Sequence, residues 1–281
     1  MEIIRIPRIM KETSKRLLVK GRTIGFVPTM GALHEGHIFL VKTARSDNDV
    51  VVASIFVNPT QFGPNEDFGK YPRDIEGDMQ KLEAAGADIL FLPDAPSIYP
   101  EGFKTFVEVS GISERLCGAY RPGHFRGVAT VVSKLINLTL PTRAYFGQKD
   151  YQQAQIIRTM VRDLNMGIDC VICSTIREGD GLAMSSRNRY LSPAERKAAT
   201  SIYRTLKAAE GMVRDGLPLI SIKENMQSAL RAEPLITEIQ YAGIYDPESL
   251  EEKTETGRAG LLAIAVMLGS TRLIDNILVE L

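Results

Sequence analysis

Two of the chain's three histidines lie in one tetrapeptide, His34-Glu35-Gly36-His37. Two imidazoles three residues apart would lie on one face of the first turn of a helix. At a helix start, the free backbone N–H groups and the positive end of the helix dipole favour phosphate. The spacing therefore predicts a nucleotide-triphosphate site, in which the imidazoles neutralise charge that develops at the α-phosphorus. A pair of surface histidines at a helix start is the alternative interpretation.

The residues around this tetrapeptide predict the elements that position it. Residues 24–27 form a short apolar run typical of a strand, and residues 28–33 form a loop that contains a glycine. Residues 35–48 have the apolar spacing of a helix. Gly31 and Gly36 would let the backbone approach phosphate closely. A strand, a glycine-containing loop and a helix start together favour phosphate binding.

A second polar loop follows the most apolar predicted strand, residues 50–57. Asn58 and Gln61 in this loop offer amide donors and acceptors that suit hydroxyl and carboxylate groups. A simple turn built on Asn-Pro explains the same residues equally well.

A third loop follows the predicted strand at residues 143–146. Gly147 and then Lys149, at the end of a strand and the start of a helix, are a cue for phosphate binding. The loop is not a Walker A loop, because the spacing of that motif is absent. A solvated pair of Lys149 and Asp150 is the alternative.

Two further segments combine glycine with polar side chains. Ser185, Ser186 and Arg187 follow a glycine-bearing stretch and could close over phosphates, since arginine adds bidentate charge-assisted hydrogen bonds. A domain linker capped by hydroxyl residues is the alternative. Residues 121–127 precede a predicted helix and contain His124, which could equally be a surface histidine in a turn.

Apolar runs and helical periods alternate over roughly the first 175 residues. The alternation predicts an α/β fold, with a Rossmann-like parallel sheet covered by helices on both faces as the nucleotide-binding catalytic domain of residues 1–176. Ligands bind such sheets beyond the carboxyl ends of the strands, where these polar loops lie. The predicted strands are residues 24–27, 50–57, 88–93, 105–109, 143–146 and 168–173.

Residues 177–281 have a different pattern, in which helices come first and strands follow. Ser192 as N-cap and Pro193 at the first position mark the start of the first helix. The pattern predicts a smaller C-terminal α+β lid domain. Its predicted elements are helices at 193–216 and 219–232 and strands at 236–245, 261–268 and 273–279.

Charge and hydropathy exclude several classes of protein. The chain of 281 residues has 34 basic and 34 acidic residues, so it lacks the positive field that nucleic-acid binding usually requires. No run approaches the roughly 20 apolar residues of a membrane span. Arg5 and Arg8 interrupt the apolar residues at the N-terminus, which is unlike a signal peptide. We therefore expect a soluble, cytoplasmic protein that binds neither nucleic acid nor membrane.

Two of the cysteines have the spacing of a redox or metal-binding motif, but they lie in a predicted strand. Cys170 and Cys173 are separated by two residues, as in redox or metal sites, but they lie inside the predicted strand at 168–173. Alternation along a strand would point the two thiols to opposite faces. No second pair completes a zinc site, so we expect core cysteines.

Five ordered segments together resemble the pantothenate synthetase (pantoate–β-alanine ligase) family. They are PTMGALHEGH, SIFVNPTQF, RPGHFRGVATVVSKL, GQKDYQQ and REGDGLAMSSRNRYL, and the resemblance spans nearly the whole chain. The HxGH element alone is also similar to nucleotidyltransferases and class I aminoacyl-tRNA synthetases. In that wider group a second loop contacts the phosphates, and residues 183–187 occupy its place here.

The resemblance implies a two-step, ATP-dependent ligation in pantothenate and coenzyme A biosynthesis. Pantoate carboxylate would attack the α-phosphorus of ATP to give pantoyl-adenylate and pyrophosphate, and β-alanine would then displace AMP. His34, His37, Lys149 and Arg187 would be the catalytic residues. The family's homodimers carry over as an expectation. Mg²⁺ is expected on the phosphate oxygens, with few protein ligands and no assigned metal-binding residue.

The resemblance also implies residues that bind the nucleotide and the two acids. Gln61 and Gln153 would hold pantoate, with Asn58 beside them, and Gln61 would also meet β-alanine. The expected nucleotide-binding residues are Met30, Gly31, Ala32, Leu33, His34, Glu35, Gly36, His37, Gly147, Gln148, Lys149, Asp150, Ile176, Met184, Ser185, Ser186 and Arg187.

Two other functions are alternatives to this ligation. A nucleotidyltransferase that keeps the nucleotidyl group on its product would lack the glutamine pair Gln61 and Gln153. A nucleotide-sensing module without catalysis would not need both histidines together with Lys149 and Arg187. A tRNA synthetase is disfavoured, because no basic anticodon-binding segment follows the catalytic part.

Overall fold

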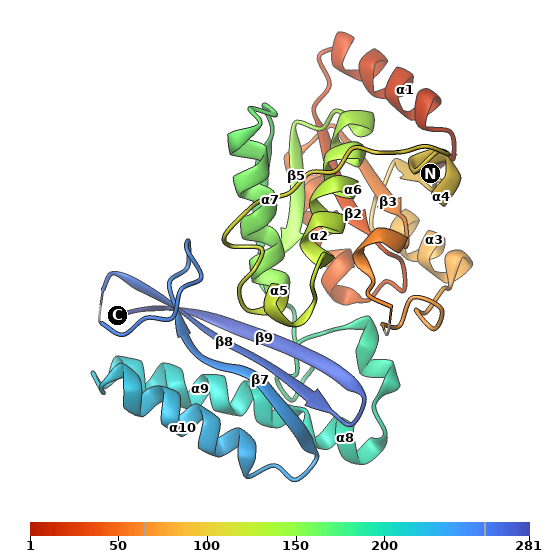
Figure 1. Ribbon diagram of the computed structural model, residues 1–281. Helices are drawn as coiled ribbons and strands as arrows, with labels where there is room; N and C mark the ends of the chain where they lie inside the picture. The colour runs from red at the N-terminus through yellow and green to blue at the C-terminus, as the bar shows by residue number, and fades with distance from the viewer. Residues whose placement is uncertain (65, 256) are drawn as a thin grey trace. The chain divides into compact units, whose positions relative to one another are not determined.

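The chain forms two compact units in the computed structural model, which describes residues 1–64, 66–255 and 257–281 (Figure 1). Unit 1 comprises Met1–Ser113, Arg121–Gly147 and Gln153–Ser174. Unit 2 comprises Thr175–Leu281 together with two short segments from earlier in the chain, Glu114–Tyr120 and Gln148–Gln152.

Unit 1 contains a parallel sheet and the helices that cover it, which confirms the predicted fold class. Its helix α7 begins in the segment that belongs to unit 2. In chain order the elements are β1 (Glu2–Ile4), α1 (Pro7–Val19), β2 (Ile24–Thr29), α2 (Glu35–Asp47), β3 (Val50–Ile55), η1 (Pro59–Gln61), α3 (Ile75–Ala84), β4 (Ile89–Phe91), α4 (Ala95–Ile98), α6 (His124–Thr139), β5 (Arg143–Gly147), α7 (Tyr151–Asp163) and β6 (Asp169–Cys173).

The order of the strands creates a reversal point in the middle of the sheet. The six strands run in the order β1-β4-β3-β2-β5-β6, and every pairing is parallel. The chain passes from β2 to β3 on one side, while β5, the other neighbour of β2, leads on to β6. Ligands of open α/β sheets bind at such a switch point, outside the carboxyl ends of the strands. The loops after β2 and β5 therefore begin at the favoured edge.

Helices bury both faces of this sheet, which explains why its central strands are almost continuously apolar. One core lies between the sheet and helices α1, α6 and α7, and the other lies between the sheet and helices α2 and α3. Helix α6 contributes Val128, Val131, Val132 and Leu135 to the first core, the apolar face that the sequence shows. Burial on both faces fixes where each strand ends, and hence where the polar loops start.

Unit 2 contains an antiparallel sheet with two long helices along one face (Figure 1). Residues from both helices and all three strands share one core. The elements are α5 (Cys117–Tyr120), η2 (Gln148–Asp150), η3 (Ser186–Tyr190), α8 (Pro193–Ala198), α9 (Thr200–Arg214), α10 (Leu219–Arg231), β7 (Ile236–Tyr245), β8 (Ala259–Leu268) and β9 (Thr271–Glu280).

Two predicted elements differ from the structure. Residues 105–109 are not a strand, because the Val107 N–H donates to the Thr130 hydroxyl at 2.9 Å instead of to a neighbouring strand. The long helix predicted at 193–216 is two helices, α8 and α9, that meet at Ala199. There the Thr200 hydroxyl donates to the Lys197 carbonyl, and the Ile202 N–H reaches back only three residues, to Ala199.

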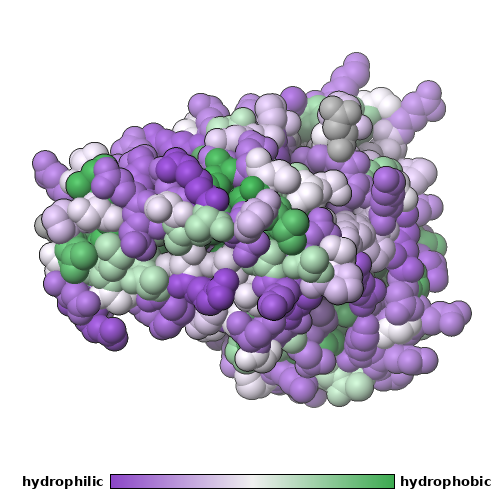
Figure 2. Space-filling view, turned by 90° about the horizontal axis from the view of Figure 1, so that it is seen from below, coloured by the Kyte–Doolittle hydropathy of each residue, from purple (hydrophilic) through white to green (hydrophobic). Residues whose placement is uncertain are grey.

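The described helices include none that is long and apolar enough to cross a membrane. On the face drawn in Figure 2, hydrophilic residues predominate and hydrophobic ones occur in small groups among them. A surface of this kind suits a chain in which about a quarter of the residues are charged.

Candidate active site

The histidine turn follows β2 and is built by the histidines themselves. His34 is the N-cap of α2, and its Nδ1 accepts the Gly36 N–H at 3.2 Å. His37 Nδ1 accepts the His34 N–H at 3.3 Å, which completes a reciprocal capping box. Because both Nδ1 atoms accept hydrogen bonds, each neutral ring carries its proton on Nε2. Each ring therefore has a donor on the side opposite its capping bond.

The two rings lie against each other, as their spacing predicts. Their centroids are 4.1 Å apart with an interplanar angle of 44°. Both imidazoles are half-buried at the N-terminus of a 13-residue helix, where backbone N–H groups add positive potential. Imidazole N–H groups at a helix start can contribute hydrogen bonds to an anionic group such as a phosphate.

A buried aspartate on α3 fixes the loop that leads into this turn. The Ala32 and Leu33 N–H groups donate to the two carboxylate oxygens of Asp78 at 2.7 and 2.8 Å. Lys81, one helical turn further on, donates to the Leu33 carbonyl at 2.9 Å. Gly31 has φ +82°, a conformation in which a side chain would be strained. Helix α3 thus holds the backbone from which His34 projects.

The sequence prediction missed Asp78, although one signal was available. Ile75, Met79 and Leu82 lie at helical spacing in the sequence of α3, and Asp78 lies three residues after Ile75, on the same side. An acidic residue on the buried side of a helix needs a hydrogen-bonding partner. Here the side chain of Asp78 is 0% exposed and its partners are the loop N–H groups.

The glutamine loop after β3 is held by its own amides. Asn58 and Gln61 are buried, at 1% and 7% exposure. The Asn58 Nδ2 donates to Gln61 Oε1 at 3.0 Å, and the Gln61 Nε2 donates to Met30 Sδ at 3.1 Å. The loops after β2 and β3 therefore meet through Met30 and Gln61, as neighbouring strands of a parallel sheet allow.

A small cavity lies at the carboxyl ends of β2, β3 and β4. Its volume is about 210 Å³, and Met30 and Gly31 are in its lining. Arg73 supplies a positive charge to a lining that otherwise includes Ile55, Phe56 and Leu92. The volume is below the roughly 300 Å³ at which pockets for drug-sized ligands begin, so it suits a small organic acid.

Two further predicted residues of unit 1 are the last residue of β5 and a residue at the start of α7. Gly147 is the last residue of this strand and pairs with Cys173 of β6. Gln153 is half-buried in the first turn of α7. Its amide forms no hydrogen bond to any residue that the structure describes, so it can bind a ligand without losing an internal partner.

In unit 2, Lys149 lies in the short turn η2, between Gln148 and Asp150. Asn276 of β9 anchors this turn: its Nδ2 donates to the carbonyls of Gln148 and Lys149, both at 3.0 Å. Asn276 is 4% exposed, so these bonds are shielded from water. The backbone beneath the lysine is thereby fixed.

The serine-arginine segment of unit 2 is a folded loop. The Met184 N–H donates to the Ile176 carbonyl at 3.0 Å, which closes the loop at its base. Ser185 caps η3 by accepting the Arg187 N–H at 3.3 Å, and Ser186 is buried. The two hydroxyls and the guanidinium thus follow one another around a single tight turn.

One strand supports both of these unit 2 segments. Arg177 forms a bidentate ion pair with Asp275 of β9, at 2.5 and 3.0 Å, and also donates to the Gly181 carbonyl at 3.1 Å. Burial raises the pKa of Asp275, and the Arg177 guanidinium opposes that rise. Asp275 and Asn276 are adjacent, so β9 holds the serine-arginine loop and the lysine turn together. The sequence prediction missed both residues, because each acts on residues about 100 or more positions away.

The cysteine pair lies in the core, as expected. Cys170 packs with the core that contains α6 and α7, and Cys173 packs with the core that contains α2 and α3. Burial raises the pKa of the Cys170 thiol to about 11 and also raises that of Cys173. Two thiols on opposite faces of a strand cannot share a metal ion or form a disulfide with each other.

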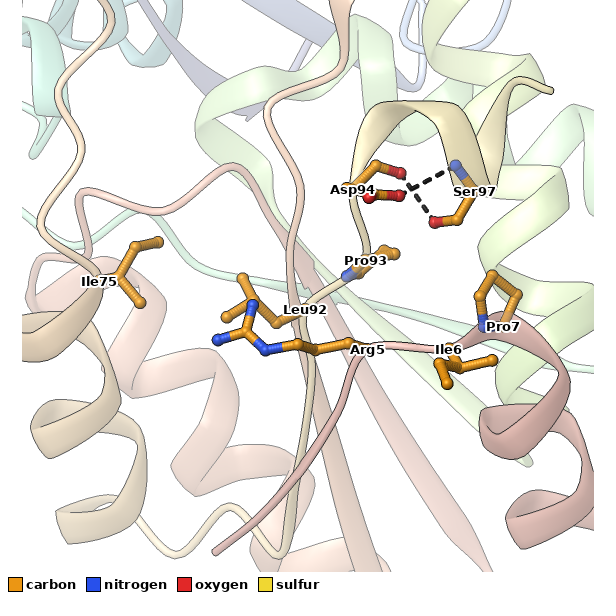
Figure 3. A pocket seen from close by; sticks show the side chains of 8 residues that line it. All are labelled: Arg5, Ile6, Pro7, Ile75, Leu92, Pro93, Asp94 and Ser97. Carbon is orange, nitrogen blue, oxygen red and sulfur yellow. Dashed lines mark hydrogen bonds between the residues drawn. The ribbon is translucent and has the colours of Figure 1, made fainter. Parts of the chain in front are cut away.

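A larger cavity of about 450 Å³ lies elsewhere in unit 1 (Figure 3). Residues that follow β1 and β4 line it, including Arg5, Leu92 and Asp94. Figure 3 shows two hydrogen bonds between Asp94 and Ser97. The Ser97 N–H donates to Asp94 Oδ1, which caps helix α4, and the Ser97 hydroxyl donates to the Asp94 carbonyl. The described lining contains none of the residues predicted for the site.

Comparison with known proteins identifies the family. The family model described as pantoate-beta-alanine ligase matches residues 2–278. The chain belongs to this family. A pantothenate synthetase of Thermodesulfovibrio yellowstonii is 59% identical over 280 residues, which cover 100% of both chains.

Solved structures of the same family share the whole fold. The crystal structure of pantothenate synthetase from Thermus thermophilus has a TM-score of 0.94 and 45% identity, with 99% of each chain covered. A pantoate-beta-alanine ligase from Francisella tularensis, complexed with beta-gamma ATP and beta-alanine, has a TM-score of 0.80 and 38% identity. That comparison covers 99% of this chain and 97% of the other.

Proposed function

We propose that this chain joins pantoate to β-alanine at the expense of ATP, through a pantoyl-adenylate intermediate, and releases AMP and pyrophosphate. The observation that carries the proposal is the His34–His37 pair. Both Nε2 donors sit at a helix N-terminus beyond the carboxyl end of β2, in a chain that matches a ligase family over residues 2–278.

The first step forms a bond between a carboxylate oxygen of pantoate and the α-phosphorus of ATP. The nucleophile is already ionised, so no proton has to be removed from it. The bond from the α-phosphorus to the bridging oxygen breaks, and pyrophosphate leaves with the bonding electrons. What this step needs is stabilisation of negative charge, which the Nε2–H groups of His34 and His37 provide.

Amide groups on unit 1 suit the binding of pantoate. We assign Gln61 and Gln153 to its hydroxyl and carboxylate groups, and Asn58 to the orientation of Gln61. Gln61 is fixed by Asn58 and Met30, while the Gln153 amide has no partner among the described residues. Because the amides are neutral, they orient the carboxylate without lowering its charge, so it remains a good nucleophile.

Cationic and hydroxyl groups on unit 2 suit the binding of phosphates. We assign Lys149, Ser185, Ser186 and Arg187 to the triphosphate, and Lys149 and Arg187 join the histidines as catalytic residues. The supporting observation is that β9 fixes the backbone of both segments. The remaining nucleotide contacts are assigned to Met30, Gly31, Ala32, Leu33, Glu35, Gly36, Gly147, Gln148, Asp150, Ile176 and Met184.

In the second step, the amine of β-alanine attacks the acyl carbon of the adenylate. The amide bond forms, the amine nitrogen releases a proton to solvent, the bond from the acyl carbon to the phosphate oxygen breaks, and AMP leaves. The relative from Francisella tularensis, complexed with beta-gamma ATP and beta-alanine, supports the assignment of these two substrates. We also assign Gln61 to β-alanine.

A magnesium ion and a second copy of the chain complete the proposal. The described residues contain no group of three or more His, Cys, Asp or Glu side chains that could hold a metal ion. We propose that Mg²⁺ is bound mainly by phosphate oxygens, where it would neutralise charge on the triphosphate. We propose a homodimer as the assembly.

One experiment tests the function. The protein is incubated with ATP, Mg²⁺ and each combination of pantoate and β-alanine, and the products are separated by chromatography. We expect AMP and pantothenate in equal amounts, and only when both acids are present. Formation of pyrophosphate together with a stable adenylated product that β-alanine does not convert would instead indicate a nucleotidyltransferase. Absence of any pantoate-dependent consumption of ATP would overturn the proposal.

A further inference from the structure

The third histidine is not a surface residue and has no role in the function proposed above. His124 is the first residue of α6 and is 8% exposed. It lies in unit 1, directly beside the turn η1 that carries Gln61. A buried imidazole is expected to have hydrogen-bond partners for its ring nitrogens.

The hydrogen bonds of His124 settle which nitrogen carries the proton. Its Nδ1 is 2.8 Å from the Gln61 carbonyl oxygen. A carbonyl can only accept, so Nδ1 must be the donor. On the other side, Arg121 Nη1 is 3.0 Å from Nε2, and a guanidinium can only donate, so Nε2 accepts. The ring is therefore neutral, with its proton on Nδ1.

An ion pair holds the arginine that faces His124. Arg121 bonds to both carboxylate oxygens of Glu66, at 2.7 and 2.5 Å. The side chains of Arg121 and Glu66 are only 15% and 24% exposed, so the pair is partly shielded from solvent. A bidentate pair fixes the plane of the guanidinium and hence the orientation of the imidazole. Glu66, Arg121 and His124 are thus connected by hydrogen bonds, and the last bond of this series is to the Gln61 carbonyl.

A second contact shows that the start of α6 is shaped to receive this turn. A Cβ atom added to Gly127 would lie 2.3 Å from the Thr60 carbonyl oxygen and 2.8 Å from Gln61 Cα. The Gly127 carbonyl accepts a hydrogen bond from Asn58 Nδ2 at 3.1 Å. The first turn of α6 therefore contacts η1 in three ways. The His124 ring donates a hydrogen bond, Gly127 allows close backbone packing, and the Gly127 carbonyl accepts a hydrogen bond.

We infer that His124 is a positioning residue for Gln61: its Nδ1–H holds the Gln61 carbonyl so that the glutamine amide faces pantoate. The inference rests on the proposed function, because it takes Gln61 as a pantoate-binding residue. Both ring nitrogens of His124 are hydrogen-bonded within the protein, Nδ1 to the Gln61 carbonyl and Nε2 to Arg121. Binding groups must be held within about 0.5 Å of their working positions. A glutamine on a three-residue turn needs external support for that accuracy.

Two substitutions of His124 distinguish a role in positioning Gln61 from a general role in the stability of the fold. In His124→Asn the amide nitrogen takes the place of Nδ1 and can still donate to the Gln61 carbonyl. In His124→Gln the amide extends toward the place of Nε2, so it faces Arg121 and the donor to Gln61 is lost. The two residues are similar in polarity and differ in where they put one N–H group.

The readout is a steady-state comparison of KM for pantoate and for ATP in both variants. We expect His124→Gln to raise the KM for pantoate by about five- to tenfold, the effect of one lost hydrogen bond, with the KM for ATP within about twofold. We expect His124→Asn to stay within about threefold of the wild type for both. Asn137→Ala, an exposed position on the same helix, serves as the control.

A further variant covers the case in which His124→Gln does not fold. Arg121→Met removes the donor to Nε2 and leaves the imidazole in place, so a smaller increase in the KM for pantoate is expected. Thermal unfolding establishes that each variant is folded at the assay temperature.

Three outcomes would overturn the inference. They are equal effects of His124→Asn and His124→Gln, an equal rise in the KM for pantoate and for ATP, or no change in any folded variant. These results, with normal wild-type turnover, overturn only the positioning role. Absence of pantoate-dependent turnover in the wild type overturns the proposed function, and this inference with it.

Discussion

Unit 1 contains a histidine pair and a cysteine pair with the same spacing in the sequence. The structure brings the two histidines together and separates the two cysteines. His34 and His37 are three residues apart at a helix start, and their rings are 4.1 Å apart. Cys170 and Cys173 are three residues apart on strand β6, and they pack into different cores on opposite faces of the sheet. Spacing in a sequence therefore has chemical meaning only together with the backbone that carries it.

The surroundings of the two pairs differ in the same way. The histidines are partly exposed, and their Nδ1 atoms accept backbone N–H groups, so each ring presents a defined donor. Burial instead raises the pKa of both thiols, which keeps them protonated and unreactive. One pair is arranged for contact with a ligand, and the other fills the core.

The largest effect should come from removing a ring of the histidine pair. We expect His37→Ala or His34→Ala to lower kcat/KM for pantoate-dependent pyrophosphate release about 100-fold or more, because a donor to the transition state is lost. Stopped or continuous pyrophosphate assays measure the rate, and Lys42→Ala, exposed on the same helix, is the matched control. Near-normal rates in both folded histidine variants would show that this turn is not part of the active site.

The next effect concerns the support beneath the histidines. Asp78→Asn keeps the shape but offers only one oxygen to the Ala32 and Leu33 N–H groups, so one buried donor loses its partner. We expect the free energy of unfolding to fall by about 2 kcal/mol. We also expect turnover to fall about tenfold, since the turn is less well positioned.

Thermal unfolding and the pyrophosphate assay, on the same preparation, measure the two effects of Asp78→Asn. A variant with unchanged stability and unchanged rate would show that α3 does not hold the histidine turn. Loss of stability with full activity would show that the turn keeps its shape without this carboxylate.

A smaller effect is expected from Gly36→Ala. The added Cβ would lie 2.9 Å from His34 Cε1 and 3.0 Å from its Nδ1, so the His34 ring must move. Alanine is the better helix former by up to about 1 kcal/mol, which offsets the roughly 1 kcal/mol lost with the His34 capping bond, so stability should not fall. We expect kcat/KM to fall about three- to tenfold while the unfolding midpoint stays constant or rises. An unchanged rate would mean that the capping bond of His34 has no bearing on activity.

The smallest effect is expected at the thiols. Cys170→Ser and Cys173→Ser should leave kcat/KM within about twofold, since each thiol packs among apolar side chains and neither has an assigned role in binding or catalysis. With a pKa of about 11, Cys170 is protonated at pH 8, and its thiolate fraction grows only as the pH rises toward that value. Iodoacetamide labelling, followed by mass spectrometry, should therefore be slow at pH 8 in the folded protein compared with the protein in urea. Fast labelling of the folded protein at pH 8 would contradict the assignment to the core.

Local patterns predicted the scaffold of unit 1 well. The strands before the histidine turn, before the glutamine loop and before Lys149 were placed within two residues, because apolar runs covered on both faces are distinctive. The first strand and helix, β1 and α1, were missed: β1 has only three residues, too few to show a pattern. Residues 105–109 have the composition of a strand but bond to a side chain instead.

The side chains that hold the candidate site in place cannot be predicted from local sequence patterns. Asp78 contacts residues 45 and 46 positions away, and Asn276 contacts residues 127 and 128 positions away. His124 reaches back 63 residues to Gln61, so the sequence left open whether it was a surface residue. Such contacts depend on how the chain folds back on itself, which a spacing rule does not encode.

The central claim is that the carboxylate of pantoate becomes bonded to the α-phosphorus of ATP. A direct test uses pantoate with ¹⁸O in both carboxylate oxygens, together with ATP, Mg²⁺ and β-alanine, and mass spectrometry of the products. The account predicts one ¹⁸O atom in each AMP and one in each pantothenate, because the bond from acyl carbon to oxygen breaks in the second step. AMP without ¹⁸O would contradict it.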